Sequence, residues 1–337
     1  MKAFVVRAPG GLDRLEVVER PDPGEPGPGE IRVALHATSL NYHDLLVAAG
    51  RIPTADGRIP MSDGAGVVEA VGAGVGEFRP GDRVVSCFFP QWQDGAPGGD
   101  VGGFARTPGD GVDGFALAYA VRPATAFTHA PPGWSHAEAA TITTAGLTAW
   151  RALVADGGLK AGDVVLALGT GGVSIAALQI AKLMGAAVIV TSSSDEKLER
   201  AKALGADHVI NYRRHEDWGE KARDWTGGRG VDHVVELGGP GTLARSIEAV
   251  RVGGHISLIG VLTGMAGEVP TALLMAKQAR LQGLIVGSRR QQQEYVAALG
   301  LSGIRPVIDR SFPFERLPEA FRHQESGAHF GKLCVEW

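Results

Sequence analysis

The sequence predicts an α/β protein in which a doubly wound parallel-sheet domain is inserted into a mostly β domain. From about residue 163 onward, apolar runs of strand length alternate with amphipathic helical stretches, a pattern typical of a parallel sheet covered on both faces. Residues 1–125 instead consist of short strand-like runs separated by Pro, Gly and Asp, and the C-terminal segment returns to short mixed elements. We therefore expect a first domain of residues 1–125 and 288–337, and a second domain of residues 126–287.

The first domain carries five runs of apolar or alternating residues with the length of strands. Turn residues separate them, and the glycine-rich segment between Pro90 and Gly114 is expected to be a long surface loop. The five runs are KAFVV, LEVVER, EIRVALHATSL, DGAGVVEAVG and DRVVSCFF.

The second domain is expected to begin with a helix and to continue as strands and helices in alternation. Ser135 and Glu138 have the spacing of a capping box, which predicts a helix start. The predicted strands are DVVLALG, AAVIVTS, DHVINY, VDHVVELG and GHISLIGV, and the first two helices between them are VSIAALQIAKLMG and SDEKLERAKALG.

Composition narrows the class of protein. The formal net charge is −4, from 33 basic and 37 acidic residues that form no run of one sign, which argues against nucleic-acid and polybasic membrane binding. No apolar run reaches the roughly 18 residues of a membrane span and no signal-type core is present, so we expect a cytoplasmic protein. The two cysteines, Cys87 and Cys334, are too few for a four-cysteine zinc site and are expected to be buried thiols.

A glycine-rich turn joins the first strand of the second domain to its helix. Gly169 permits the tight turn, and Gly171 lets backbone amides approach a pyrophosphate at the helix N-terminus. Ser174 stands at the third glycine of the dinucleotide fingerprint and is still small enough for helix–strand packing. The strand–turn–helix context predicts dinucleotide binding by Gly169, Thr170, Gly171, Gly172 and Val173.

The end of the next strand favours NADPH over NADH. An NAD site usually ends this strand with a carboxylate that binds the ribose, whereas here Ser192 and Ser193 stand there, with Lys197 one turn later. Hydroxyl groups and an ammonium would suit a 2′-phosphate. Two alternatives remain: Ser194 is simply a helix N-cap, or Asp195 turns back to the ribose. Tyr212 either lines the adenosine pocket or lies on the surface.

The sequence resembles the medium-chain dehydrogenase/reductase superfamily over nearly its whole length. The matching motifs include PGPGEIRVALHATSLNYHDLL, DGAGVVEAVGAGV, FRPGDRVV, TAGLTAWRAL, GTGGVSIAALQIAK and GAHFGK. The resemblance implies a GroES-like β domain and a Rossmann domain with a nicotinamide cofactor. It also implies an enzyme that forms a homodimer or a tetramer of dimers.

The resemblance locates the zinc-ligand positions of the zinc-dependent members. These positions hold Asn41, Ser62 and Thr144, and Asp63 stands at the acidic residue that follows the family's histidine ligand. Amide and hydroxyl side chains are poor zinc ligands, and residues 90–114 contain no cysteine for a structural zinc. We therefore expect no zinc.

Without zinc, no Lewis acid is available to polarise the oxygen of an alcohol or of a saturated carbonyl compound. The expected reaction is therefore hydride transfer to a quinone or an α,β-unsaturated carbonyl, whose developing oxyanion is stabilised by hydrogen bonds. Alternatives are an alcohol dehydrogenase-like reductase of aldehydes or ketones, and a non-catalytic NADPH sensor.

The Asn41-Tyr42-x-Asp44 pattern resembles the zinc-independent quinone oxidoreductase branch. Asn41 and Tyr42 are candidate donors to the substrate carbonyl, and Asp44 is expected to brace the loop by hydrogen bonding. His43 is either a general acid or a residue packed beneath the loop. Where many such reductases carry an arginine and an aromatic residue, this chain has Ala49 and Ile52.

The resemblance also suggests contacts to the nicotinamide half of the cofactor, although each of these residues could instead be an ordinary turn or surface residue. These candidates are Thr144, Thr148, Gly260, Val261, Val286, Gly287, Ser288 and Lys332.

Overall fold

The computed structural model describes residues 1–99 and 101–337. The chain forms two compact units, which we call unit 1 (Met1–Leu147 with Val286–Trp337) and unit 2 (Thr148–Ile285). Unit 2 begins at Thr148, later than the boundary at residue 126 expected from the sequence. The reason is local packing, because the segment after residue 126 adds a strand and a helix to the sheet of unit 1.

Unit 1 is built on a seven-stranded sheet of order β14-β15-β3-β4-β5-β7, with β6 also paired to β3. All five strand-like runs of the N-terminal sequence are strands, as predicted. Strand β15 pairs antiparallel with β3, with Cys334 opposite Ser39, so the C-terminal strand lies beside the end of β3. The strands are β1 (Lys2–Val6), β2 (Leu15–Glu19), β3 (Glu30–Ser39), β4 (Ala65–Val71), β5 (Arg83–Ser86), β6 (Tyr119–Pro123), β7 (Phe127–His129), β14 (Ile308–Pro313) and β15 (Lys332–Glu336).

Three helices of unit 1 begin at a capping box. Ser135 accepts from the Glu138 backbone N–H at 3.1 Å and Glu138 accepts from the Ser135 N–H at 2.7 Å, which confirms the predicted capping box. Helix α2 is short, however, and continues as a π-helical turn. The helices of unit 1 are α1 (Tyr42–Ala48), α2 (His136–Ala140), α9 (Arg289–Ser302) and α10 (Leu317–Glu325), with a π-helical turn at Ile142–Gly146. Helix α3 (Leu147–Trp150) begins at the last residue of this part of unit 1, and the π-helical turn at Arg151–Ala155 belongs to unit 2.

The segment between Pro90 and Gly114 is a surface loop in its middle, where residues 94–99 are exposed, but it is partly buried near both ends; residue 100 lies outside the described residues. Trp92 and Thr107 are buried, and Phe104 stacks on Phe89 with ring centroids 6.2 Å apart. Aromatic side chains at these positions pack the segment onto unit 1 despite its high glycine content. A short 3₁₀ helix lies at Val101–Gly103.

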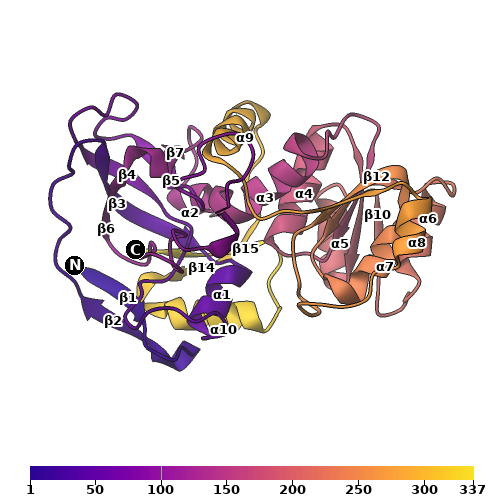
Figure 1. Ribbon diagram of the computed structural model, residues 1–337, viewed down its shortest axis with the longest axis horizontal. Helices are drawn as coiled ribbons and strands as arrows, with labels where there is room; N and C mark the ends of the chain where they lie inside the picture. The colour runs from indigo at the N-terminus through magenta and orange to yellow at the C-terminus, as the bar shows by residue number, and fades with distance from the viewer. Residues whose placement is uncertain (100) are drawn as a thin grey trace. The chain divides into compact units, whose positions relative to one another are not determined.

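Unit 2 is a doubly wound α/β domain, which confirms the predicted fold class. Its six strands are all parallel in the order β10-β9-β8-β11-β12-β13, and helices pack around the sheet (Figure 1). The strands are β8 (Val164–Leu168), β9 (Ala187–Ser192), β10 (His208–Asn211), β11 (Val231–Glu236), β12 (Val250–Leu258) and β13 (Arg280–Gly283), and the helices are α4 (Gly172–Leu183), α5 (Asp195–Ala203), α6 (Trp218–Trp225), α7 (Pro240–Ala249) and α8 (Thr271–Ala276).

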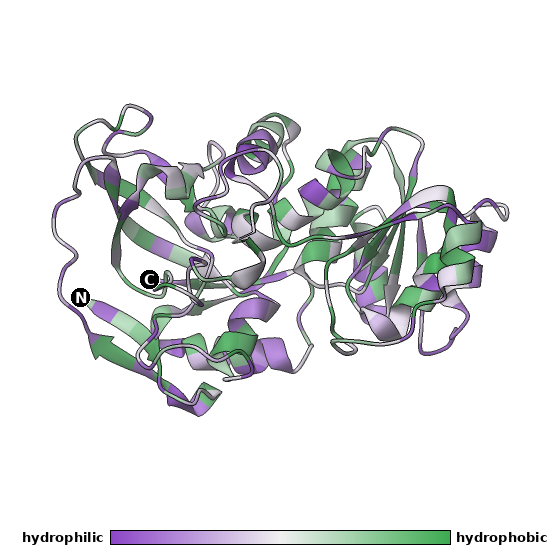
Figure 2. Cartoon of the chain, in the orientation of Figure 1, coloured by the Kyte–Doolittle hydropathy of each residue, from purple (hydrophilic) through white to green (hydrophobic). Residues whose placement is uncertain are grey.

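The core of unit 2 lies along these strands. β8 is buried over its whole length, as expected for a central strand covered on both faces. Figure 2 colours the strands mostly as hydrophobic and places hydrophilic residues on the surrounding helices. Among the described residues, no helix is both long and apolar enough to cross a membrane.

Candidate active site

The turn between β8 and α4 forms an open cradle in unit 2. Gly169 has φ +79°, a left-handed conformation that favours glycine, and Gly171 is the N-cap of α4 without a side-chain cap. A Cβ atom built at either glycine would meet no other atom within 4 Å. Uncapped backbone N–H groups therefore face free space at a helix N-terminus, which fits a pyrophosphate. Gly169, Thr170, Gly171, Gly172 and Val173 would hold this part of the cofactor.

Ser174 replaces the third glycine of the fingerprint without loosening the helix. Its side chain is fully buried, and its hydroxyl donates to the Leu168 carbonyl at 2.6 Å. This bond ties the first turn of α4 to the end of β8. The small-residue requirement predicted from the sequence is therefore met by a side chain that also forms a hydrogen bond.

The end of β9 is organised by its serines. Ser194 is the N-cap of α5 and accepts from the Lys197 backbone N–H at 3.3 Å, so the capping alternative is correct for this residue. Ser192 is buried and its hydroxyl accepts from the Ser194 N–H at 3.2 Å. Ser193 is partly exposed, and the Tyr212 side chain is 41% exposed.

Asp195 is engaged by two neighbouring side chains. Asn211 donates to its Oδ1 at 2.7 Å, and Arg214 forms an ion pair with its Oδ2. Arg214 and its neighbour Arg213 were not identified in the sequence, although they directly follow Tyr212. Two guanidinium groups after β10 add positive charge near the end of β9, because β9 and β10 are paired neighbours.

Glu236, at the end of β11, is a further residue that the sequence did not reveal. Its side chain is fully buried, and its Oε1 accepts from the backbone N–H groups of Gly238 (2.8 Å) and Gly239 (3.0 Å) and from the Thr242 hydroxyl (2.6 Å). Ser246 donates to Oε2. One carboxylate therefore anchors the loop between β11 and α7. The sequence did carry a signal for this role: a glutamate at the end of an apolar strand, shortly before the turn residues Gly-Gly-Pro.

Other cofactor candidates have mixed surroundings. In unit 2, the Gly260 backbone N–H donates to the Glu236 carbonyl at 3.2 Å, Val261 is 37% exposed and Thr148 is buried.

Three further cofactor candidates lie in unit 1. Ser288 caps α9 through its hydroxyl, which accepts from the Gln291 N–H at 3.2 Å. Val286 has φ +48°. Such a conformation is uncommon for a β-branched residue and is found mainly where the surrounding structure enforces it. Gly287 lies between Val286 and Ser288.

Asn41 and Asp44 begin helix α1 in unit 1. The Asp44 carboxylate accepts from the Asn41 backbone N–H at 3.0 Å and, through its other oxygen, from the Ser62 N–H at 2.8 Å. This is the bracing role expected for Asp44. The Asn41 amide nitrogen donates to Asp44 (3.0 Å) and to Asp63 (2.8 Å), and its oxygen accepts from Lys332 at 2.6 Å. Its strong donors are therefore used within the protein, unlike the expected donor to a substrate carbonyl.

Asp63 is the centre of this buried network. It accepts from Thr144 at 2.6 Å, from Ser39 at 2.5 Å and from Asn41 at 2.8 Å, and its side chain is fully buried. Burial raises the pKa of Asp63 to about 6, although the nearby Lys332 ammonium acts in the opposite direction.

Lys332 lies inside this buried network. Its ammonium donates to the Leu40 carbonyl and to the Asn41 side chain, both at 2.6 Å, and lies 3.9 Å from the Asp63 carboxylate. Burial lowers the pKa of Lys332. The contact between Lys332 and the cofactor stays a prediction, and in this structure the ammonium is hydrogen-bonded within unit 1. The Thr144 hydroxyl is likewise committed to Asp63.

The three positions that hold zinc ligands in related dehydrogenases come together here but do not fit a zinc ion. The Asn41 amide nitrogen lies 3.4 Å from the Ser62 hydroxyl, and Thr144 joins Asn41 through Asp63. An amide N–H₂ and two hydroxyls offer neither thiolate nor imidazole. Within residues 1–99 and 101–337, no group of three or more His, Cys, Asp or Glu side chains is arranged to hold a metal ion.

Tyr42 and His43 differ in environment from Asn41. Tyr42, the first residue of α1, is 41% exposed. His43 is mostly covered, with Nε2 located 3.1 Å from Asp110 Oδ2 and its ring packed against Phe88 and Phe104. The packed alternative for His43 is thus partly correct, but its neighbour is a carboxylate.

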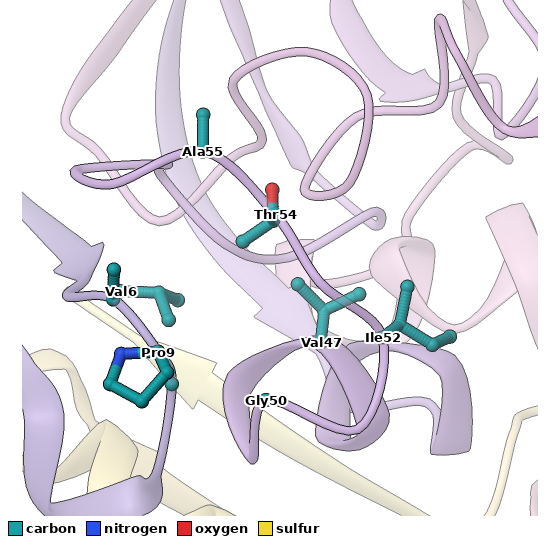
Figure 3. A pocket seen from close by; sticks show the side chains of 9 residues that line it. Val6, Pro9, Val47, Gly50, Ile52, Thr54 and Ala55 are labelled. Carbon is teal, nitrogen blue, oxygen red and sulfur yellow. The ribbon is translucent and has the colours of Figure 1, made fainter.

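A small crevice opens beyond the end of α1, with an empty volume of about 180 Å³ that includes open solvent. Figure 3 shows Val6, Val47 and Ile52 among its lining side chains. The lining is mainly aliphatic and glycine or proline, and the Thr54 hydroxyl already donates to the Asp110 carbonyl at 3.0 Å. The crevice therefore offers few polar groups for chemistry.

The fold and the cradle define the class of protein: the chain is an NAD(P)-dependent oxidoreductase that belongs to the medium-chain dehydrogenase/reductase superfamily. Residues 27–132 match the model of the alcohol dehydrogenase GroES-like domain, and residues 172–302 match that of the zinc-binding dehydrogenase. The chain is 42% identical to the zinc-type alcohol dehydrogenase-like protein of Schizosaccharomyces pombe, over 97% of this chain and 96% of that protein.

Solved structures agree with this assignment. An NAD-dependent alcohol dehydrogenase is 37% identical with a TM-score of 0.90 and full coverage of both chains. The quinone oxidoreductase of Pseudomonas syringae pv. Tomato DC3000 is 27% identical with a TM-score of 0.83, over 100% of this chain and 99% of that chain. The crotonyl-CoA carboxylase/reductase AntE, solved with NADP, is 27% identical with a TM-score of 0.85, over 100% and 94%.

Proposed function

We propose that this oxidoreductase is a zinc-independent, NADPH-dependent reductase of quinones or α,β-unsaturated carbonyl compounds. The observation that carries the proposal is the network of Asn41, Ser62 and Thr144 around Asp63, which offers hydroxyl and amide groups in place of zinc ligands. A conjugated acceptor needs no metal to become electrophilic, because its carbonyl already activates the carbon that receives hydride. Similarity to a quinone oxidoreductase and to a crotonyl-CoA carboxylase/reductase supports this acceptor class.

NADPH is the proposed cofactor, and when bound it supplies the hydride. Ser192, Ser193 and Lys197 would receive the 2′-phosphate, while Asp195, the carboxylate that follows them, contacts Asn211 and Arg214. Similar proteins do not decide between the two cofactors, because one is named an NAD-dependent alcohol dehydrogenase and another was solved with NADP. The proposed preference for NADPH over NADH is therefore based on the residues at the end of β9 and the start of α5.

The first test is oxidation of NADPH and NADH, with a metal chelator, against quinones, enones, aldehydes and ketones. We expect chelator-insensitive turnover of quinones or enones and a preference for NADPH. Lys197→Glu should reduce that preference about tenfold or more by repelling the 2′-phosphate, whereas Lys202→Glu, on the same helix, should leave it unchanged. Turnover of aldehydes and ketones alone would contradict the proposed acceptor, and NADPH binding without any turnover would indicate a sensor.

We also propose that the protein is a homodimer with no nucleic-acid or membrane partner. Strand β13 lies at the edge of the sheet of unit 2, and Leu262, Met265 and Met275 nearby in sequence are 57%, 86% and 74% exposed. An open sheet edge with exposed apolar side chains favours pairing with a second chain. Light scattering should give about twice the chain mass of 35.1 kDa, whereas a monomer mass would contradict the proposal.

A further inference from the structure

His43 is the second residue of α1 and is held by groups from another part of unit 1. Its side chain is 16% exposed. The imidazole packs edge-on against Phe88, with ring centroids 5.7 Å apart, and against the tilted ring of Phe104, with ring centroids 4.8 Å apart. Two aromatic walls restrict the rotation of the ring, so the direction in which each ring nitrogen points is defined.

Asp110 faces one of these nitrogens. Its Oδ2 lies 3.1 Å from His43 Nε2, and its side chain is 12% exposed. The backbone of Asp110 is fixed on both sides, because its N–H donates to the Thr107 carbonyl at 3.2 Å and its carbonyl accepts from the Thr54 hydroxyl at 3.0 Å. The contact has the distance of an ion pair but not the alignment of a hydrogen bond.

The two ring nitrogens of His43 are therefore not equivalent. Nε2 is buried against a carboxylate, which favours the tautomer with the proton on Nε2. Among the described residues, Nδ1 is not one of the buried nitrogens without a hydrogen-bond partner, and the His43 side chain as a whole is 16% exposed. A carboxylate that faces one ring nitrogen and leaves the other to meet a substrate is the arrangement that orients a general acid or base.

We propose that His43 is the general acid of the reductase and that Asp110 is the residue that positions its imidazole. This proposal rests on the proposed function. The reduced nicotinamide gives hydride to the acceptor, and the new C–H or O–H bond leaves negative charge on an acceptor oxygen. The Nδ1–H bond of the His43 imidazolium breaks, and its proton forms the O–H bond. His43 remains neutral with Nε2–H toward Asp110 and regains a proton from solvent.

The surroundings of His43 favour this assignment over a purely structural pair. Asp110 is the charged side chain found in contact with the ring among the described residues, while Phe88 and Phe104 carry no charge. Asp44, on the same helix, is committed to Asn41 and Ser62. The Asn41 amide is also committed, so it does not compete as a proton donor to the acceptor.

The kinetic test compares His43→Ala, Asp110→Asn and the control His323→Gln, a histidine 3.9 Å from Asp309. We expect His43→Ala to lower kcat at least about 100-fold, with partial rescue by added imidazole and with NADPH affinity unchanged by fluorescence titration. Asp110→Asn should lower kcat about tenfold, and His323→Gln should match the parent. A kcat within twofold of the parent in His43→Ala would overturn the proposal.

A second measurement does not depend on turnover. In ¹⁵N-detected spectra of the full chain, the His43 signals, assigned by their loss in His43→Ala, should show the Nε2–H tautomer, and Asp110→Asn should increase the Nδ1–H form. A predominant Nδ1–H tautomer in the parent would overturn the positioning by Asp110. If the parent reduces no acceptor, the proposed function fails, while the tautomer result still decides whether Asp110 holds the ring.

Discussion

Replacement of Lys332 by methionine should destabilise unit 1 by about 3–5 kcal/mol at pH 8, because it leaves the fully buried Asp63 carboxylate without its neighbouring cation. The substitution also removes a donor from the Leu40 carbonyl and from the Asn41 side chain. Chemical denaturation, combined with hydrogen exchange of β3 and β15, measures the loss in unit 1.

The pH dependence of this loss follows from the pKa of Asp63. Burial raises that pKa to about 6 in the folded protein, above its unfolded value, so ionisation of Asp63 costs stability as the pH rises through this value. Removing the ammonium raises the pKa further. The deficit of Lys332→Met should therefore be largest at pH 8 and should shrink at pH 5, where Asp63 is protonated in the folded state.

Two controls separate the buried pair from an ordinary ion pair. Lys182→Met, which breaks the half-exposed pair with Asp207, should cost no more than about 1 kcal/mol. Adding Asp63→Asn to Lys332→Met should recover part of the stability, since no buried charge then remains. A Lys332→Met deficit equal to that of Lys182→Met at both pH values would show that the pair does not hold unit 1.

Glu236→Ala should destabilise unit 2 by about 4 kcal/mol or more. The change leaves four donors without their acceptor: the N–H groups of Gly238 and Gly239 and the hydroxyls of Thr242 and Ser246. A buried donor without a partner costs roughly 1–3 kcal/mol. Hydrogen exchange should show the loop between β11 and α7 opening while unit 1 stays protected.

Glu236→Gln is the matched test of this explanation. The amide oxygen can still accept from three donors, and the amide nitrogen can donate to the Ser246 hydroxyl after that hydroxyl rotates. We therefore expect less than half the loss of Glu236→Ala. Glu248→Ala, which removes a surface pair with Arg245, should stay within about 1 kcal/mol of the parent. Equal losses in Glu236→Ala and Glu248→Ala would contradict the anchoring role.

Much of the fold was predictable because its signals are local. Apolar runs define β8 and β9, and the turn at Gly169–Gly171 needs only its own residues and the strand and helix beside it. The domain boundary was less accurate, since the assignment of β7 and α2 to unit 1 depends on pairing with strands far away in the sequence. The 90–114 segment packs through contacts such as that between Phe104 and Phe89, and no periodic pattern in the sequence predicts such a contact.

The sequence by itself determined the dinucleotide cradle, the serines at the end of β9 and the loss of zinc-ligand residue types at positions 41, 62 and 144. These follow from residue identity at fixed spacing. Only the tertiary structure decided what Asn41, Lys332 and His43 contact. Lys332 meets Asn41 across 291 positions of the chain, and His43 meets Asp110 from a separate loop. Hydrogen bonds and ion pairs depend on proximity in space, which the folding of unit 1 alone creates.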